Sequence, residues 1–140
     1  MKIFFPKEQD NEIRIAIVPS VVKKYVGLGA EVLIESGAGK PINISDKDYT
    51  DAGGIIAKNR LDALSSADIV CRLNAPVAEE IRELKKDSIH VSFLDPIKEK
   101  SLVDAFMGAS VTAISMELIP RITRAQKMDA LSSQASLGGY

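Results

Sequence analysis

The 140-residue sequence lacks any run of about 18 apolar residues, so it contains no candidate membrane-spanning helix. Its apolar start, residues 1–6, is too short for a secretory signal, and Glu8 and Asp10 follow at once. The single cysteine, Cys71, excludes an internal disulfide and is compatible with a reducing compartment. These absences favour a cytoplasmic protein with no direct insertion into a membrane.

An excess of charge of one sign is also missing. Eighteen basic and nineteen acidic residues give a net charge of -1, and no long basic run occurs, which argues against a nucleic-acid partner. The sequence is 46% hydrophobic, and at this length it predicts one globular domain with a real core.

Histidine is as scarce as cysteine, because His90 is the only one. With one of each residue, no metal site of common ligand spacing can be assembled, so no metal is predicted. His90 lies between Ile89 and Val91 in a strand-like run and points to the opposite face from both. A general base is possible there, but a structural histidine is the favoured interpretation, and a Ser-His-Asp triad has no local support.

Short β-type runs alternate with helical patterns along the chain. Strands are predicted at residues 2–5, 31–35, 55–57, 67–73, 88–94 and 111–115. Helices are predicted from Pro19 to Gly27 or Gly29, from 45–46 to 53–54, from Pro76 through Leu84, and over 96–107. This alternation predicts a three-layer, Rossmann- or flavodoxin-like α/β domain with a mainly parallel sheet and right-handed crossovers.

Ligands of such sheets bind outside the carboxyl ends of the strands. The residues at those positions are Lys7, Arg14, Asn74, Asp95 and everything after Ser115. Arg14 has two open interpretations: a solvated arginine beside the acidic Glu12, or a bidentate anchor for a carboxylate or phosphate.

The glycines do not form a dinucleotide-binding fingerprint. Residues 37–39 read Gly-Ala-Gly, but Pro41 follows and Ile42 stands where the third glycine of G-x-G-x-x-G is needed. A plain turn is therefore the favoured interpretation. No complete fingerprint occurs in residues 1–140, so a dinucleotide-binding domain of that type is absent from this sequence.

The last 24 residues are rich in hydrogen-bonding side chains. Thr123 and Gln126 have the spacing of a capping box, which predicts a helix beginning there, and Gln126, Asp129 and Ser132 would then share one face. One interpretation is a capped amphipathic helix with a solvated polar stripe. The other is a binding site, because Arg121, Gln126 and Asp129 offer donors and acceptors suited to a carboxamide-bearing ring and its ribose.

Residues 116–134, Met-Glu-Leu-Ile-Pro-Arg-Ile-Thr-Arg-Ala-Gln-Lys-Met-Asp-Ala-Leu-Ser-Ser-Gln, closely resemble the signature loop of the alpha subunit of proton-translocating NAD(P) transhydrogenase. The opening, with Pro-Lys-Glu at 6–8, Arg-Ile-Ala-Ile at 14–17 and Gly-Ala-Gly at 37–39, resembles a wider group that includes alanine dehydrogenase. The resemblance is collinear over essentially all 140 residues. It implies that residues 1–140 form the first of two Rossmann-like domains in an NAD(H)-binding component, with the fingerprint in the second.

The resemblance also implies roles for individual residues. Arg121 and Asp129 would hold the nicotinamide and ribose region of NAD(H), and Ser132 would hydrogen-bond the carboxamide. Gln126 would reach toward the nicotinamide of NADP(H) on a partner component and, with Arg121 and Asp129, form the catalytic set. Tyr140 would lie on a mobile approach to the site. The implied reaction is direct hydride transfer from NADH to NADP+, coupled to proton translocation across a membrane.

The implied partners are the NADP-binding and membrane components of the transhydrogenase, together with a second copy of this component in a homodimer. Through them the chain would associate peripherally with the inner membrane. Two alternatives remain open. An alanine dehydrogenase would need a lysine where Asn74 stands and a histidine where Asp95 stands, and both departures argue against it. The other alternative is a non-catalytic binding or interaction domain, because the fingerprint is missing.

Overall fold

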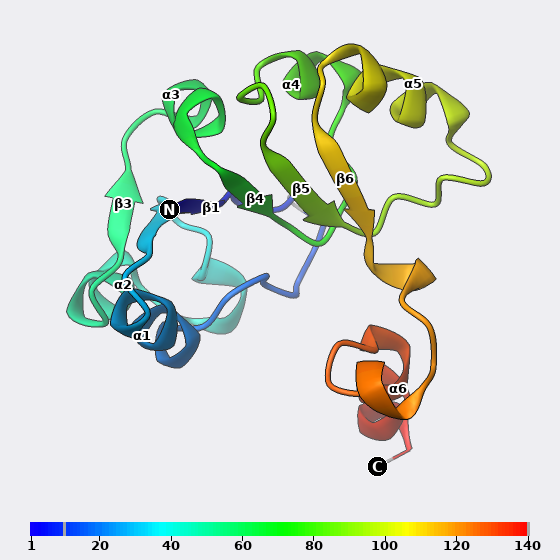
Figure 1. Cartoon of the computed structure of the whole chain (residues 1–140). Helices are drawn as coiled ribbons and strands as arrows, with labels where there is room; N and C mark the ends of the chain where they lie inside the picture. Colours follow the sequence, from blue (N-terminus) through cyan, green and yellow to red (C-terminus); the bar gives the residue numbers. More distant parts are fainter. Residues whose placement is uncertain (10, 140) are drawn as a thin grey trace.

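Six short parallel strands form one sheet in the computed structural model, which describes residues 1–9 and 11–139 (Figure 1). They are β1 (Lys2–Phe5), β2 (Glu31–Glu35), β3 (Ile55–Ala57), β4 (Ile69–Cys71), β5 (Ile89–Ser92) and β6 (Thr112–Ser115). The order across the sheet is β3-β2-β1-β4-β5-β6, and every neighbouring pair is parallel. The predicted α/β fold with a parallel sheet is confirmed, and each predicted strand lies within two residues of an observed one.

Helices cover the two faces of this sheet unequally. They are α1 (Pro19–Gly27), α2 (Asp46–Asp51), α3 (Arg60–Ser66), α4 (Ala78–Arg82), α5 (Lys100–Gly108) and α6 (Ala130–Gly138). Figure 1 shows α1 and α2 on one side, α3 to α5 on the other, and α6 apart from both groups, beyond the ends of β5 and β6. Three 3-10 turns complete the chain: η1 (Lys40–Ile42), η2 (Met116–Leu118) and η3 (Thr123–Ala125). In the described part of the chain, no helix has the length and apolarity that crossing a membrane requires.

The alternating side chains of β1 divide the core in two, because successive residues of a strand point to opposite faces. Ile3 and Phe5 belong to the cluster beneath α1 and α2, together with Val22 and Tyr49. Phe4 belongs to the opposite cluster, which α3, α4 and α5 cover. A hydrophobic run on a central parallel strand is what burial on both faces requires.

Tyr49 of α2 is completely buried, and its hydroxyl donates a hydrogen bond of 2.9 Å to the backbone oxygen of Ile17. Tyr49→Phe removes that donor and leaves a buried carbonyl without it, so we expect a loss of about 1–2 kcal/mol in the free energy of unfolding. Urea denaturation measures this loss. The matched control is Tyr25→Phe, because Tyr25 is 36% exposed. Equal losses in both variants would contradict the assignment to this hydrogen bond.

Two helices differ from the sequence prediction. No element is predicted between β3 and β4, but α3 lies there, beginning after Asn59, whose side chain accepts hydrogen bonds from the N–H groups of Leu61 and Asp62. Asparagine before a run of helix formers is a recognisable start signal. The helix predicted at 96–107 begins only at Lys100, because a turn precedes it in which the N–H groups of residues 98 and 99 donate to the oxygen of Asp95.

The strand order creates a crevice at the carboxyl ends of β1 and β4. From β1 the chain runs outward through β2 and β3, and it then returns to place β4, β5 and β6 on the other side of β1. The loops after β1 and β4 therefore leave the sheet in opposite directions. In open α/β sheets, this switch point is where ligands bind.

Candidate functional site

Glu8 joins the two loops at the switch point. Its carboxylate accepts hydrogen bonds from the backbone N–H of Asn74 (3.1 Å), the side-chain amide of Asn74 (3.2 Å) and the backbone N–H of Leu73. Glu8 is 9% exposed, so the carboxylate is largely shielded from water while it makes these contacts. The loop after β1 is thereby fixed against the loop after β4.

Arg14 lies on the same crevice and is paired with Glu12. Its Nε and Nη2 atoms each donate to a different carboxylate oxygen at 2.8 Å. The amide of Asn74 donates to the same carboxylate at 3.3 Å. Chiefly because of the Arg14 hydrogen bonds, the pKa of Glu12 is lowered to about 2. Of the two interpretations of Arg14, the pairing with an acidic neighbour is observed, although half of the arginine side chain remains exposed.

Glu117 of η2 anchors the segment that follows the sheet. Its carboxylate accepts hydrogen bonds from the backbone N–H groups of Leu94 (3.1 Å) and Asp95, just after β5. Burial alone raises the pKa of Glu117, but hydrogen bonds to its carboxylate outweigh burial and the net shift is downward. The segment from residue 116 onward is therefore held over the carboxyl ends of β5 and β6.

The helix in this segment begins later than predicted. Residues 123–125 form only a 3-10 turn without a side-chain cap, so the predicted capping box of Thr123 and Gln126 is wrong. Asp129 is the cap of α6 instead, accepting hydrogen bonds from the N–H groups of Leu131 (3.1 Å) and Ser132 (3.2 Å) and from the Ser132 hydroxyl. Aspartate is among the best residues at this position because its short carboxylate reaches the unpaired N–H groups of the first turn.

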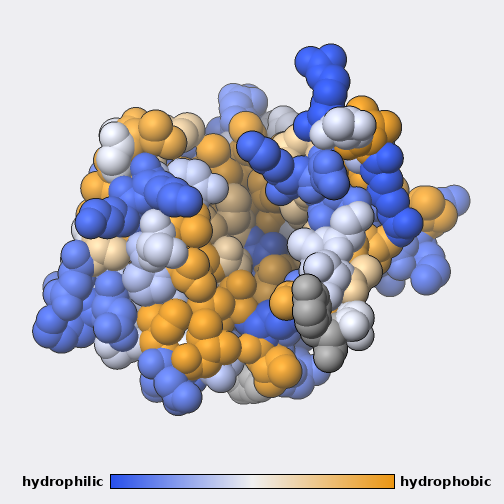
Figure 2. All heavy atoms as spheres, turned by 90° about the horizontal axis from the view of Figure 1, so that it is seen from below, coloured by the Kyte–Doolittle hydropathy of each residue, from blue (hydrophilic) through white to orange (hydrophobic). Residues whose placement is uncertain are grey.

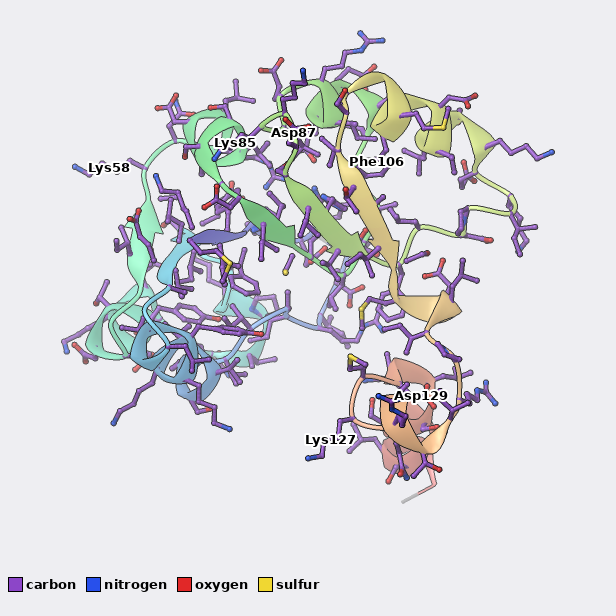
Figure 3. The ribbon with its side chains drawn as sticks, in the orientation of Figure 1. Lys58, Lys85, Asp87, Phe106, Lys127 and Asp129 are labelled. Carbon is purple, nitrogen blue, oxygen red and sulfur yellow. The ribbon has the colours of Figure 1, made fainter. Side chains whose placement is uncertain are left out.

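The later start does not scatter the predicted residues. Arg121, Gln126, Asp129 and Ser132 line one cavity of about 250 Å³, with Ile122 and Thr123 beside them. They come from a loop, a 3-10 turn and a helix cap, so the prediction that three of them share one helix face is wrong, although they do lie together. Figure 3 shows Asp129 beside α6 and Lys127 projecting away from it into open space. Tyr140, the remaining predicted residue, lies outside the described residues.

Asp129 is 6% exposed, and the hydroxyl and N–H of Ser132, with a smaller contribution from Arg121, lower its pKa. It is therefore an anion at neutral pH inside a polar cavity that also contains a guanidinium. Together these side chains present one cation, one anion, an amide and hydroxyl groups to whatever enters the cavity.

A second cavity of about 320 Å³ adjoins the first, since Arg121 and Asp129 line both. Its other walls include Arg14 from the switch point and Gln134 from α6. A third, of about 270 Å³, extends from Arg14 and Gln134 to Cys71 on β4. Figure 2, which views this side of the molecule, shows a hollow with hydrophobic residues along its walls.

Sequence reasoning missed the apolar part of these cavities. Phe93, Met116 and Ala130 line them, and Gln134 faces the same space one helical turn after Ala130. The position of Phe93 just after β5 was an available signal. Lys7, Asn74 and Asp95, which were predicted near the ligand, line none of the three cavities.

Three remaining sequence features are structural. Burial of His90 lowers its pKa to about 3, and its Nε2 lies 3.1 Å from the Ser92 hydroxyl, which agrees with the structural interpretation. Burial raises the pKa of the Cys71 thiol to about 11. The glycine-rich residues 37–39 form a turn, as predicted, and the N–H of Gly37 donates to Asp46 at 2.8 Å.

Comparison with known proteins places this site in a family. Residues 4–138 match the model of the family described as alanine dehydrogenase/PNT, N-terminal domain. The chain belongs to this family. Over its whole length it is 44% identical to an NAD(P) transhydrogenase subunit alpha protein of Rhodospirillum rubrum, of which it covers 38%.

Solved structures agree with this membership of the alanine dehydrogenase/PNT N-terminal domain family. The transhydrogenase of Sinorhizobium meliloti superimposes with a TM-score of 0.92 at 38% identity, covering all of this chain and 42% of that one. An L-alanine dehydrogenase superimposes with a TM-score of 0.81 at 30% identity, covering 89% and 34% respectively. The chain thus resembles transhydrogenase alpha subunits more than these alanine dehydrogenases, and it spans well under half the length of either.

Proposed function

We propose that this chain is the N-terminal domain of the NAD(H)-binding component of NAD(P) transhydrogenase, and that it serves hydride transfer from NADH to NADP+. The observation that carries the proposal is the cavity in which Arg121, Gln126, Asp129 and Ser132 lie together. The cavity is small and polar, and it is open to an adjoining space with apolar walls. A nicotinamide ring with a carboxamide and a ribose has the same division into apolar and polar parts.

The proposed roles follow from the chemistry of each group. Arg121 and Asp129 hold the nicotinamide–ribose region of NAD(H), and the Ser132 hydroxyl bonds the carboxamide. Gln126 lies at the end of η3, and its amide orients the second nicotinamide, which the NADP-binding partner carries. The hydride leaves C4 of the NADH ring with its electron pair and joins C4 of NADP+. Because no proton is exchanged with the chain, this reaction needs positioning groups and no general acid.

The same reasoning disfavours oxidation of an amino acid, which needs a cation for the substrate carboxylate and a proton carrier. Asn74, at the position of the expected lysine, is neutral and already hydrogen-bonded to Glu8 and Glu12. Asp95, at the position of the expected histidine, lies 3.3 Å from Lys98 and lines none of the three cavities. Relatives named NAD(P) transhydrogenase subunit alpha support the transhydrogenase assignment.

The wider assembly is part of this proposal. A second domain would carry the G-x-G-x-x-G fingerprint, and separate components would bind NADP(H) and translocate protons across the membrane. The component would be a homodimer, associated peripherally with the inner membrane through those partners.

The proposal is tested by joining the chain to its second domain and combining it with the NADP-binding component. Hydride transfer from NADH to a thio-analogue of NADP+, followed by absorbance, is the expected result. Oxidation of L-alanine by the same protein, with no transfer to the analogue, would refute it.

A second candidate function is a binding or interaction domain without catalysis. It is favoured by the absence of a complete G-x-G-x-x-G in the sequence, because that loop holds the pyrophosphate. We therefore expect NADH titrated into the 140-residue chain to bind more weakly than about 1 µM, a level that corresponds to about -8 kcal/mol. Calorimetry checks this. Micromolar binding would show that the described cavities suffice for NAD(H) affinity without that loop.

A further inference from the structure

Arg14 is a carboxylate-binding group whose binding edge is filled by its own chain. A guanidinium binds carboxylates best through two parallel N–H donors, and Arg14 uses its Nε and Nη2 donors on the two oxygens of Glu12, both at 2.8 Å. The same guanidinium borders the two cavities that adjoin the loop cavity. A small carboxylate entering either cavity would meet an arginine that is already occupied.

The neighbouring charges reinforce this occupancy. Glu8 and Glu12 contribute two negative charges, Arg14 contributes one positive charge, and Asn74 contributes none. The Asn74 amide donates to Glu8 at 3.2 Å and to Glu12 at 3.3 Å, so it holds both carboxylates in place without neutralising either. A lysine at position 74 would instead give these carboxylates a second cation.

We propose that Glu12, held by Asn74, is a specificity-determining residue that keeps small carboxylates such as 2-oxo acids out of the Arg14 cavity. Removal of its charge uncovers a latent small-carboxylate site between the switch point and α6. The site lies where ligands of open α/β sheets bind, between the loops after β1 and β4. The proposal rests on the geometry of this cluster, and it stands whether or not hydride transfer is the reaction.

The test is binding of pyruvate to the full chain, measured by calorimetry and by the NMR signal of the Arg14 Nε–H group. Pyruvate should bind the native chain weakly or not at all. Glu12→Gln should bind it at least about tenfold more tightly, with a shift of the Arg14 signal, because an amide cannot accept from both donors. Glu12→Ala is a second variant for the same purpose.

Glu8→Gln is the matched control, because it removes the same single charge and leaves both Arg14–Glu12 contacts in place. It should gain less than either Glu12 variant. Equal gains in Glu8→Gln and Glu12→Gln would overturn the proposal, since net charge and not occupancy would then decide. Tight pyruvate binding by the native chain, or none by folded Glu12→Gln and Glu12→Ala, would overturn it as well.

Discussion

Replacing Asp129 with alanine will lower hydride transfer from NADH in the complete enzyme by about 10²-fold or more, because misplacing reacting groups by about 1 Å has that effect. Asp129 has two tasks in the structure. Its carboxylate caps α6 through the N–H groups of Leu131 and Ser132, and it forms part of the wall that separates the loop cavity from the adjoining one. Alanine removes both the cap and the charge, so α6 and the hydroxyl of Ser132 lose their anchor together.

Asp129→Asn separates the two tasks. The asparagine oxygen can still accept from the first turn of α6, but it carries no charge. If the charge holds the nicotinamide–ribose region, the asparagine variant should lose most of the activity that alanine loses while α6 keeps its helicity. The matched control is Asp104→Ala, an exposed aspartate on α5 away from all three cavities. Stopped-flow rates with NADH and an NADP+ analogue measure the effect. Near-native rates in Asp129→Ala would remove Asp129 from the site.

Much of the fold is legible in the sequence because local signals and tertiary structure agree. The run of β1, Ile3-Phe4-Phe5, needs burial on both sides, and the observed core supplies it on both faces. The prediction fails where two local signals compete. Thr123 with Gln126 and Asp129 with its neighbours both resemble helix starts, and the structure uses only the second.

The candidate site is less legible, because its contacts join distant parts of the chain. Glu8 and Asn74 are 66 residues apart, and Glu12 and Asn74 are 62 residues apart. No local pattern reports that Asn74 will bind two carboxylates or that Arg14 will face Gln134 of α6. Residues 121, 126, 129 and 132 could be singled out by resemblance alone, and their roles remain predictions.

Replacing Gln126 with asparagine will lower hydride transfer by about 10²-fold and leave NADH affinity nearly unchanged. Gln126 lines only the loop cavity among the three described, whereas Arg121 and Asp129 line two. Its side chain is therefore placed to touch the outer partner nucleotide more than the bound NAD(H). Asparagine keeps the amide but shortens it by one methylene, so the loss should fall on orientation and not on anchoring.

The matched control is Gln9→Asn, which makes the same chemical change at an exposed residue in the loop after β1. The Kd for NADH, obtained from fluorescence quenching, and the single-turnover rate of transfer to an NADP+ analogue together separate affinity from chemistry. A slower rate with an unchanged Kd agrees with the proposed role. An NADH Kd that rises as much as the rate falls would make Gln126 a ground-state ligand of NADH, on the same footing as Arg121. In that case the orientation of the second ring would have to come from the NADP-binding partner.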